Sequence, residues 1–154
     1  MIYINQISNI CTNEYDEVWW IVRSPDASPQ KEKLVQSLAP SRQLFRKYRE
    51  AFHAGHFDAE FFRNEYVPQF LKELAENSEA RETLAYLCKK GGTENIALGC
   101  YCENEKLCHR SIIAGVLIGM GAQVEAEQEY LKYYELFQKY LFDKKIQKWI
   151  NRQS

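Results

Sequence analysis

The sequence lacks an excess of charge of either sign and lacks a hydrophobic run long enough to cross a membrane. Its 20 lysines and arginines almost balance its 21 aspartates and glutamates, and the two signs are interspersed. A chain without a basic patch has no electrostatic footprint for nucleic acid or an anionic membrane. The apolar segment 112–122 is shorter than the roughly 20 residues that span a bilayer. We therefore expect neither nucleic acid nor membrane as a partner.

The chain also lacks the features of a secreted, disulfide-rich protein. Its first residues, MIYINQISNI, have no basic start, long apolar core or small-residue cleavage site. Five cysteines are an odd number, which favours free thiols in a reducing compartment. A chain of 154 residues can bury a core without disulfides. These features predict one cytoplasmic domain over residues 1–154.

Residues 95–121 predict a buried strand, a polar loop and an apolar helix in succession. Ile96, Ala97 and Leu98 form a short apolar run, as in a strand covered on both faces. Residues 103–106 are polar and should reach the surface. Gly115 and Gly119 would let the following helix approach the sheet closely. Apolar residues recur in that helix at helical spacing: Ile112, Ile113, Val116, Leu117 and Met120.

Most of the chemistry lies where this strand and helix meet. Cys100 and Cys102 would share one face if the strand continues that far. Cys108, His109 and Arg110 stand at the start of the helix, where free backbone N–H groups favour anions. The helix dipole and Arg110 would lower the pKa of the Cys108 thiol, so Cys108 is a candidate reactive thiolate. The alternative is that these cysteines are small buried hydrophobes.

The remaining segments predict a three-layer α/β fold with a small, mostly parallel sheet flanked by helices. Residues 17–24 form a strong strand, and Arg23 at its end would reach the cysteines if the two strands are parallel. Otherwise Arg23 is a rim arginine paired with a surface carboxylate. Short strands are expected near Ile4 and Val124. Ser41 should cap the first of three helices that separate the two main strands.

The C-terminal residues 127–150 predict a long helix with an aromatic stripe, which we expect to cover one face of the sheet. A dimer contact is the alternative use of this stripe. His53 and His56 lie three residues apart, but Gly55 interrupts the pair, so we expect no metal there.

Four segments resemble the uncharacterised DUF488 family, with features of its YeaO-like branch: EVWWIVRS, LAPS, FFRNEYVPQFLKEL and LGCYCENEKLCHRSIIAGVL. The resemblance covers residues 18 to about 122. It implies a compact α/β domain with a shared catalytic or ligand-binding crevice, into which the LAPS and NEY segments would carry Ser41 and Tyr66. Either Cys100 or Cys102 would match the family's strand-end cysteine.

A weaker likeness links the same junction to rhodanese domains. Their active strand also ends in a cysteine, followed by a loop of backbone amides and an Arg-Ser helix start, similar here to Cys102, Arg110 and Ser111. Such a site suits a thiolate that accepts sulfur or phosphate. The loop here is longer, and its Glu103 and Glu105 would repel an anion.

Three functions remain open at this point. In the first, Cys108 or Cys102 is a nucleophile, His109 is its acid or base, and Arg23 and Arg110 hold a small anionic substrate. In the second, zinc is bound by Cys100, Cys102, Cys108 and His109, although Arg110 would oppose a cation. In the third, the domain binds a ligand without catalysis and Arg110 forms a structural ion pair with Glu103. We place Cys100 and Glu103 among the crevice residues and expect no cofactor and no resident metal, and we predict no oligomeric state.

Overall fold

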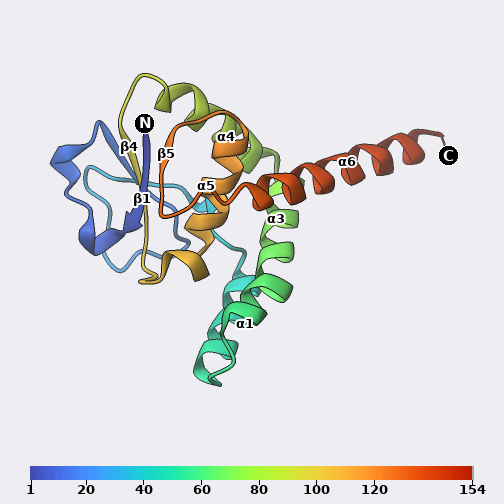
Figure 1. Ribbon diagram of the computed structural model, residues 1–154, viewed down its shortest axis with the longest axis horizontal. Coiled ribbons are helices and arrows are strands. Elements are labelled where there is room, and N and C mark those ends of the chain that lie inside the picture. Colours follow the sequence, from blue (N-terminus) through green and yellow to red (C-terminus); the bar gives the residue numbers. More distant parts are fainter. Residues whose placement is uncertain (154) are drawn as a thin grey trace.

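The computed structural model describes residues 1–153 and contains a parallel sheet at its centre (Figure 1). Its described strands are β1 (Ile2–Gln6), β2 (Glu17–Trp20), β3 (Lys33–Leu34), β4 (Ile96–Cys100) and β5 (Val124–Glu125). They lie in the order β3-β2-β4-β1-β5, and every pair is parallel. β2 and the cysteine-bearing β4 are parallel neighbours, which is the condition under which Arg23 would reach the cysteines. β4 lies between β2 and β1, so all five of its residues are buried.

Helices cover one face of the sheet, and the segment between β1 and β2 covers the other. Helices α4 (Ser78–Gly91) and α5 (His109–Gly119) pack on the face that carries Ile2 and Leu98. On the opposite face Ile7 and Ile10 lie over Gly99, and two 3₁₀ helices occur here, η1 (Ile7–Asn9) and η2 (Thr12–Glu14). The result is the expected three-layer α/β arrangement.

The long connection from β3 to β4 carries most of the remaining helices. It contains η3 (Gln36–Leu38), α1 (Arg42–His53), α2 (Ala59–Phe61), the π-helical turn η4 (Phe62–Tyr66) and α3 (Val67–Glu76), followed by α4. Ser41, Asp58 and Asn77 cap successive helix starts by accepting hydrogen bonds from backbone N–H groups. Three short polar residues thus divide this connection into separate helices.

One sequence expectation about the second strand needs correction. β2 ends at Trp20, so Val22 and Arg23 lie beyond the strand. Helix α1 is only partly buried: Leu44 is buried, but Phe45 and Phe52 are 43% and 60% exposed. Much of the apolar surface of α1 therefore borders solvent.

The C-terminal helix α6 (Leu131–Gln153) packs against α3 and α5, and the prediction that it covers the sheet is wrong. Figure 1 shows it extending away from the sheet. Gly115 and Gly119 face this segment instead of the sheet, because a Cβ atom at Gly115 would lie 2.1 Å from the carbonyl oxygen of Tyr130. Helix α5 therefore contacts the sheet through one side and the C-terminal segment through its glycines. None of the helices within residues 1–153 has the length and apolar character required to span a membrane.

Candidate functional site

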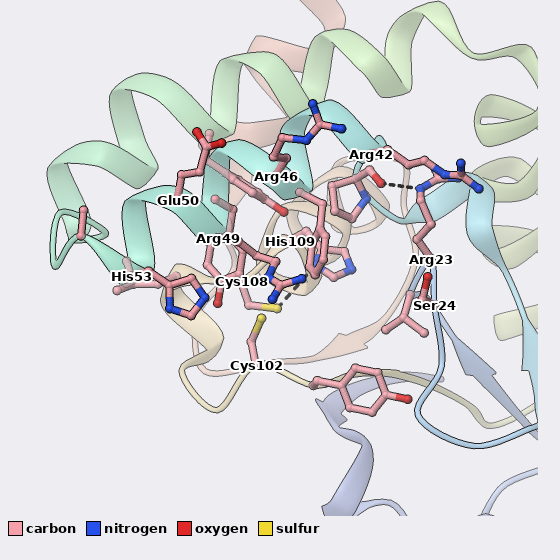
Figure 2. A pocket seen from close by; sticks show the side chains of 18 residues that line it. Arg23, Ser24, Arg42, Arg46, Arg49, Glu50, His53, Cys102, Cys108 and His109 are labelled. Carbon is pink, nitrogen blue, oxygen red and sulfur yellow. Dashed lines mark hydrogen bonds between the residues drawn. The ribbon is translucent and has the colours of Figure 1, made fainter.

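A pocket of about 880 Å³ opens beside the carboxyl ends of β2 and β4 (Figure 2). Helix α1 forms one wall, the segment after β2 forms a second, and the loop before α5 forms a third. That loop contains the short 3₁₀ helix η5 (Glu105–Leu107). The predicted crevice is therefore present at the edge of the sheet where parallel strands end.

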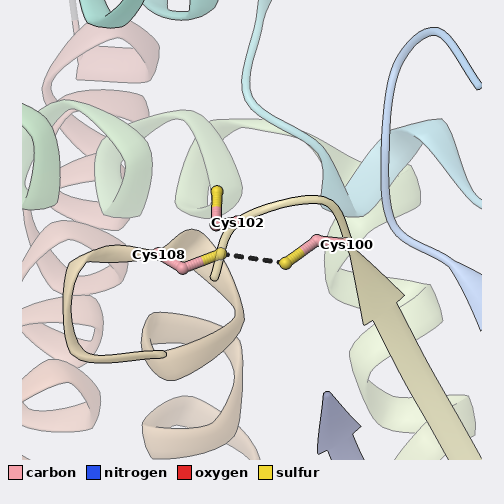
Figure 3. A group of neighbouring side chains, drawn as sticks. All are labelled: Cys100, Cys102 and Cys108. Carbon is pink, nitrogen blue, oxygen red and sulfur yellow. Dashed lines mark hydrogen bonds between the residues drawn. The ribbon is translucent and has the colours of Figure 1, made fainter. Parts of the chain in front are cut away.

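Three cysteines come together beside this pocket (Figure 3). Cys102 and Cys108 line it, whereas Cys100, which we expected in the crevice, is buried behind them. The Sγ atoms of Cys100, Cys102 and Cys108 all lie within 4.8 Å of one another, and those of Cys100 and Cys108 are 3.0 Å apart. Cys100 is the last residue of β4, and Cys108 is the residue that precedes α5. Cys102 lies after the strand has ended, so the bend of the loop, and not strand alternation, brings it to the other two.

Arg110 holds this cluster from behind. Its Nη1 donates to Cys100 Sγ at 3.0 Å and to the Cys102 carbonyl at 2.5 Å, and its Nη2 donates to the Glu103 carbonyl at 3.3 Å. Arg110 is only 3% exposed, and it donates to a sulfur atom and to backbone oxygens. The alternative of a structural ion pair with Glu103 is wrong: Arg110 bonds the Glu103 carbonyl, while the Glu103 side chain is exposed. Arg110 thus faces the thiols and does not line the pocket.

The cluster stabilises one thiolate, at Cys100. Hydrogen bonds from Cys102 and Cys108, together with the charges of His109 and Arg110, hold the pKa of Cys100 well below its usual range. Burial raises the pKa of Cys108, and the adjacent Cys100 adds to this effect. The same neighbour raises the pKa of Cys102 to about 12. The prediction that Cys108 carries the lowered pKa is wrong, because burial outweighs the helix start and Arg110 points to Cys100.

His109 is buried behind Cys108 and is oriented by the backbone. Its Nε2 lies 2.7 Å from the carbonyl oxygen of Ile21, so Nε2 carries a hydrogen and donates it. Its Nδ1 lies 3.7 Å from Cys108 Sγ, and Phe70 packs edge-on against the ring. One imidazole nitrogen is therefore fixed by the segment after β2, and the other faces sulfur.

The remaining predicted residues fall into two groups. Arg23 and Tyr66 line the pocket, and Arg23 is held by a 2.9 Å hydrogen bond from Nε to the Pro40 carbonyl. Ser41 does not line the pocket. Its hydroxyl caps α1 and donates a 2.5 Å hydrogen bond to the Glu73 carboxylate. Glu105 also lies elsewhere: its carboxylate accepts from Tyr130 Oη and from the Glu127 N–H. The expected repulsion of an anion by Glu105 therefore does not apply to this pocket.

Sequence reasoning missed the arginines of α1. Arg42, Arg46 and Arg49 all line the pocket, and Figure 2 shows Arg42 and Arg46 away from Cys102, with Arg49 nearer the cysteines. Their spacing of four and three residues places them on one face of a helix. This cluster of arginines could have been recognised from the sequence. Tyr48, from the same helix, also lines the pocket; burial and its hydrogen bond with Cys102 raise the pKa of Tyr48 to about 12.

Comparison with known proteins identifies the family of this chain. No curated protein and no solved structure matches this chain. The YeaO-like features and the rhodanese likeness stay predictions. A family model described as "Active DUF488-N3 subclade" matches residues 2–121, which include the whole sheet except β5, the arginines of α1 and the cysteine cluster. The chain therefore belongs to the DUF488 family, in the subclade that this description names.

Proposed function

We propose that this protein is a thiol-dependent enzyme that acts on a small anionic substrate. The observation that carries the proposal is the cysteine cluster: three sulfur atoms lie within 4.8 Å of one another, Arg110 donates to that of Cys100, and Cys102 and Cys108 line an arginine-rich pocket. A structural cysteine needs no stabilised thiolate, whereas a nucleophilic one does. The description of the matching subclade as active agrees with this proposal.

Cys102 is the nucleophile in this proposal. It lines the pocket and is partly exposed, while Cys100 is fully buried behind it. The hydrogen bond between the two thiols lets Cys102 transfer its proton to Cys100, which moves the negative charge to the sulfur that a substrate can reach. Arg110 stabilises the charge at either position, because it bonds both Cys100 Sγ and the Cys102 carbonyl.

His109 and Cys108 form the second proton path. The imidazole Nδ1 lies 3.7 Å from Cys108 Sγ, and Cys108 contacts Cys100 at 3.0 Å. A proton that reaches the cluster can therefore be held on His109 or returned to a leaving group, as general acid–base catalysis requires. Arg23 and the arginines of α1 hold the anionic group of the substrate above Cys102.

Alkylation with iodoacetamide across pH 5–9, followed by peptide mapping, tests the proposal. Cys102 is the accessible sulfur of the cluster, so the midpoint pH of its alkylation should follow the first ionisation of the cluster and lie below that of Cys11, an exposed cysteine of the same chain outside the cluster. Replacing Cys100 by serine removes the thiol that ionises first, so the midpoint for Cys102 should move up. Replacing Cys11 by serine should leave the midpoint for Cys102 unchanged. A midpoint for Cys102 at or above that of Cys11 in the folded wild-type protein would refute a nucleophilic role.

Zinc binding is the second candidate, because three thiol sulfurs and the His109 ring lie close together. The donor types fit zinc, but the spacing fits less well. Two sulfurs on one tetrahedral zinc are about 3.8 Å apart for bonds of about 2.3 Å, and Cys100 and Cys108 are 3.0 Å apart with Arg110 bonded to the former. Elemental analysis of the same preparation before alkylation separates the two functions: stoichiometric zinc that protects all three thiols would replace the enzyme proposal by a metal site.

A further inference from the structure

The pocket gathers more positive charge than a single small anion requires. Four arginines line it, Arg23, Arg42, Arg46 and Arg49, against one carboxylate, that of Glu50. The ion pairs found within residues 1–153 involve Lys33, Lys47 and Lys90 and none of these arginines. Unpaired guanidinium groups that border one cavity repel one another unless an anion lies between them. The surplus of three charges matches a ligand with two or more phosphate groups.

Arg23 is already oriented for such a ligand. Its Nε donates to the Pro40 carbonyl and its Nη2 reaches the Gln36 carbonyl at 3.5 Å, which fixes the plane of the guanidinium. The arginines of α1 approach from the other wall on successive turns of one helix face. Guanidinium groups on two walls suit a chain of phosphates, because each presents a planar pair of donors to the oxygens of one phosphate.

The same pocket offers aromatic surface that phosphates do not need. Phe45, Tyr48, Tyr66 and Tyr101 line it, and Phe45 remains 43% exposed there. Tyr101 is held at the edge by a 2.6 Å hydrogen bond from the Asp26 N–H to its hydroxyl. Aromatic rings beside arginines are the usual surroundings of a nucleobase, which stacks on the ring face while the backbone of the nucleotide meets the charges.

We propose that the pocket binds a nucleoside 5′-diphosphate or a closely related nucleotide, with its phosphates on the arginines and its base against the aromatic residues. The volume of about 880 Å³ is large enough for such a ligand, while inorganic phosphate would leave most of it unfilled. This inference names the substrate class of the proposed enzyme, so it rests on the proposed function. The binding itself requires no reactive thiol.

Isothermal titration calorimetry of the full chain with ADP, pyrophosphate and adenosine tests the inference. We expect ADP to bind most tightly, pyrophosphate more weakly and adenosine weakest. Arg46→Gln should weaken ADP at least about tenfold, the loss of one charge-assisted hydrogen bond. Lys47→Gln is the matched control, because Lys47 lies next to it on α1 but pairs with Glu65 outside the pocket lining, and it should leave affinity unchanged.

Replacing Tyr101 separates the two halves of the ligand. Tyr101→Leu should weaken ADP about fivefold or more through lost stacking, and should leave pyrophosphate unchanged. Equal binding of adenosine and ADP, an unchanged affinity in Arg46→Gln, or tighter binding of a single-stranded oligonucleotide than of ADP would each overturn the inference. Cys11→Ser, outside the pocket lining, should keep ADP affinity. Nucleotide binding without a reactive Cys102 would thus refute the enzyme alone, and a reactive Cys102 without nucleotide binding would refute the substrate class alone.

Discussion

Arg110 adds a buried positive charge beside the Cys100 thiol. It lies at the start of α5, and its guanidinium turns back to the end of β4 and to the loop that follows. A cation in this position helps the hydrogen bonds from Cys102 and Cys108 to stabilise the Cys100 thiolate, since little water remains to screen the two charges. Part of the stabilisation therefore comes from a side chain that lines no part of the pocket.

Arg110→Met removes this cation and should raise the pH at which Cys102 is alkylated. We expect the midpoint to move up by at least about one pH unit, because one unit corresponds to only about 1.4 kcal/mol of differential stabilisation. Circular dichroism establishes that the variant is folded, and Arg110→Lys, which keeps the charge without the forked donors, should shift the midpoint less. Arg63→Gln changes an exposed arginine outside the pocket and is the control. An unchanged midpoint in folded Arg110→Met would exclude this role.

At the level of single residues, the sequence predicted which side chains come together but not which thiol is ionised. Cys100, Cys102, Cys108, His109 and Arg110 do meet, as the strand-loop-helix pattern indicated. Which thiol is ionised depends on how deeply each is buried and on where Arg110 points, and both follow from tertiary packing. Local spacing contains neither quantity, so the helix-start argument selected Cys108 instead of Cys100.

Helix α5 packs against the C-terminal segment at two of its glycines, Gly115 and Gly119. A Cβ at Gly115 would lie 2.1 Å from the Tyr130 carbonyl oxygen, and one at Gly119 would lie 2.0 Å from the Tyr134 ring. Gly115→Ala should therefore destabilise the protein by about 2 kcal/mol or more, since the atom it strikes is backbone and cannot rotate away. Chemical denaturation monitored by tryptophan fluorescence measures the change.

Gly92→Ala is the comparison for this substitution. Gly92 has an ordinary helical φ of −69°, and its Cβ would meet only the Lys89 carbonyl oxygen at 3.3 Å. We expect a much smaller loss than at Gly115. Tyr130 also donates to the buried Glu105 of the cysteine loop, so Gly115→Ala should in addition loosen that loop and increase hydrogen exchange near η5. Equal stabilities for the two variants would mean that α6 docks elsewhere.

At the level of elements, the sequence predicted which segments are helices and strands better than it predicted what they pack against. Ser41 caps α1 as expected, because capping depends on neighbouring backbone groups alone. The aromatic stripe of α6 indicated a buried face, but amphipathicity does not name the partner, which is α3 and α5.

Across the whole molecule, a near-neutral composition conceals a strongly charged site. A formal net charge of −1 argued against nucleic acid and membrane partners and gave no sign of four arginines around one pocket. Net charge is a sum over the surface, while a binding site depends on which charges the fold brings together. Arg23 and the arginines of α1 are separated by the loop that contains β3, so only the folded chain shows them as one group.

The buried tyrosines make the whole protein sensitive to base. Burial raises the pKa values of Tyr48, Tyr66, Tyr130 and Tyr133, and Glu105 adds to the effect at Tyr130. Above pH 10 the unfolded chain loses these protons while the folded chain keeps them, so the unfolded state binds fewer protons and stability falls as pH rises. We expect cooperative unfolding between about pH 10 and 12, seen together by circular dichroism and tyrosinate absorbance.

Tyr130→Phe tests this origin directly. The variant lacks the hydrogen bond to Glu105 and should be less stable than the wild type near neutral pH. It also lacks one of the phenols that resists ionisation, so its stability should fall less steeply with pH, and the gap to the wild type should narrow above pH 10. Denaturant titrations at pH 7 and at several values above 10 measure the gap. A gap that stays constant would assign the alkaline sensitivity to groups other than Tyr130, because only a phenol that the fold keeps protonated can change the slope.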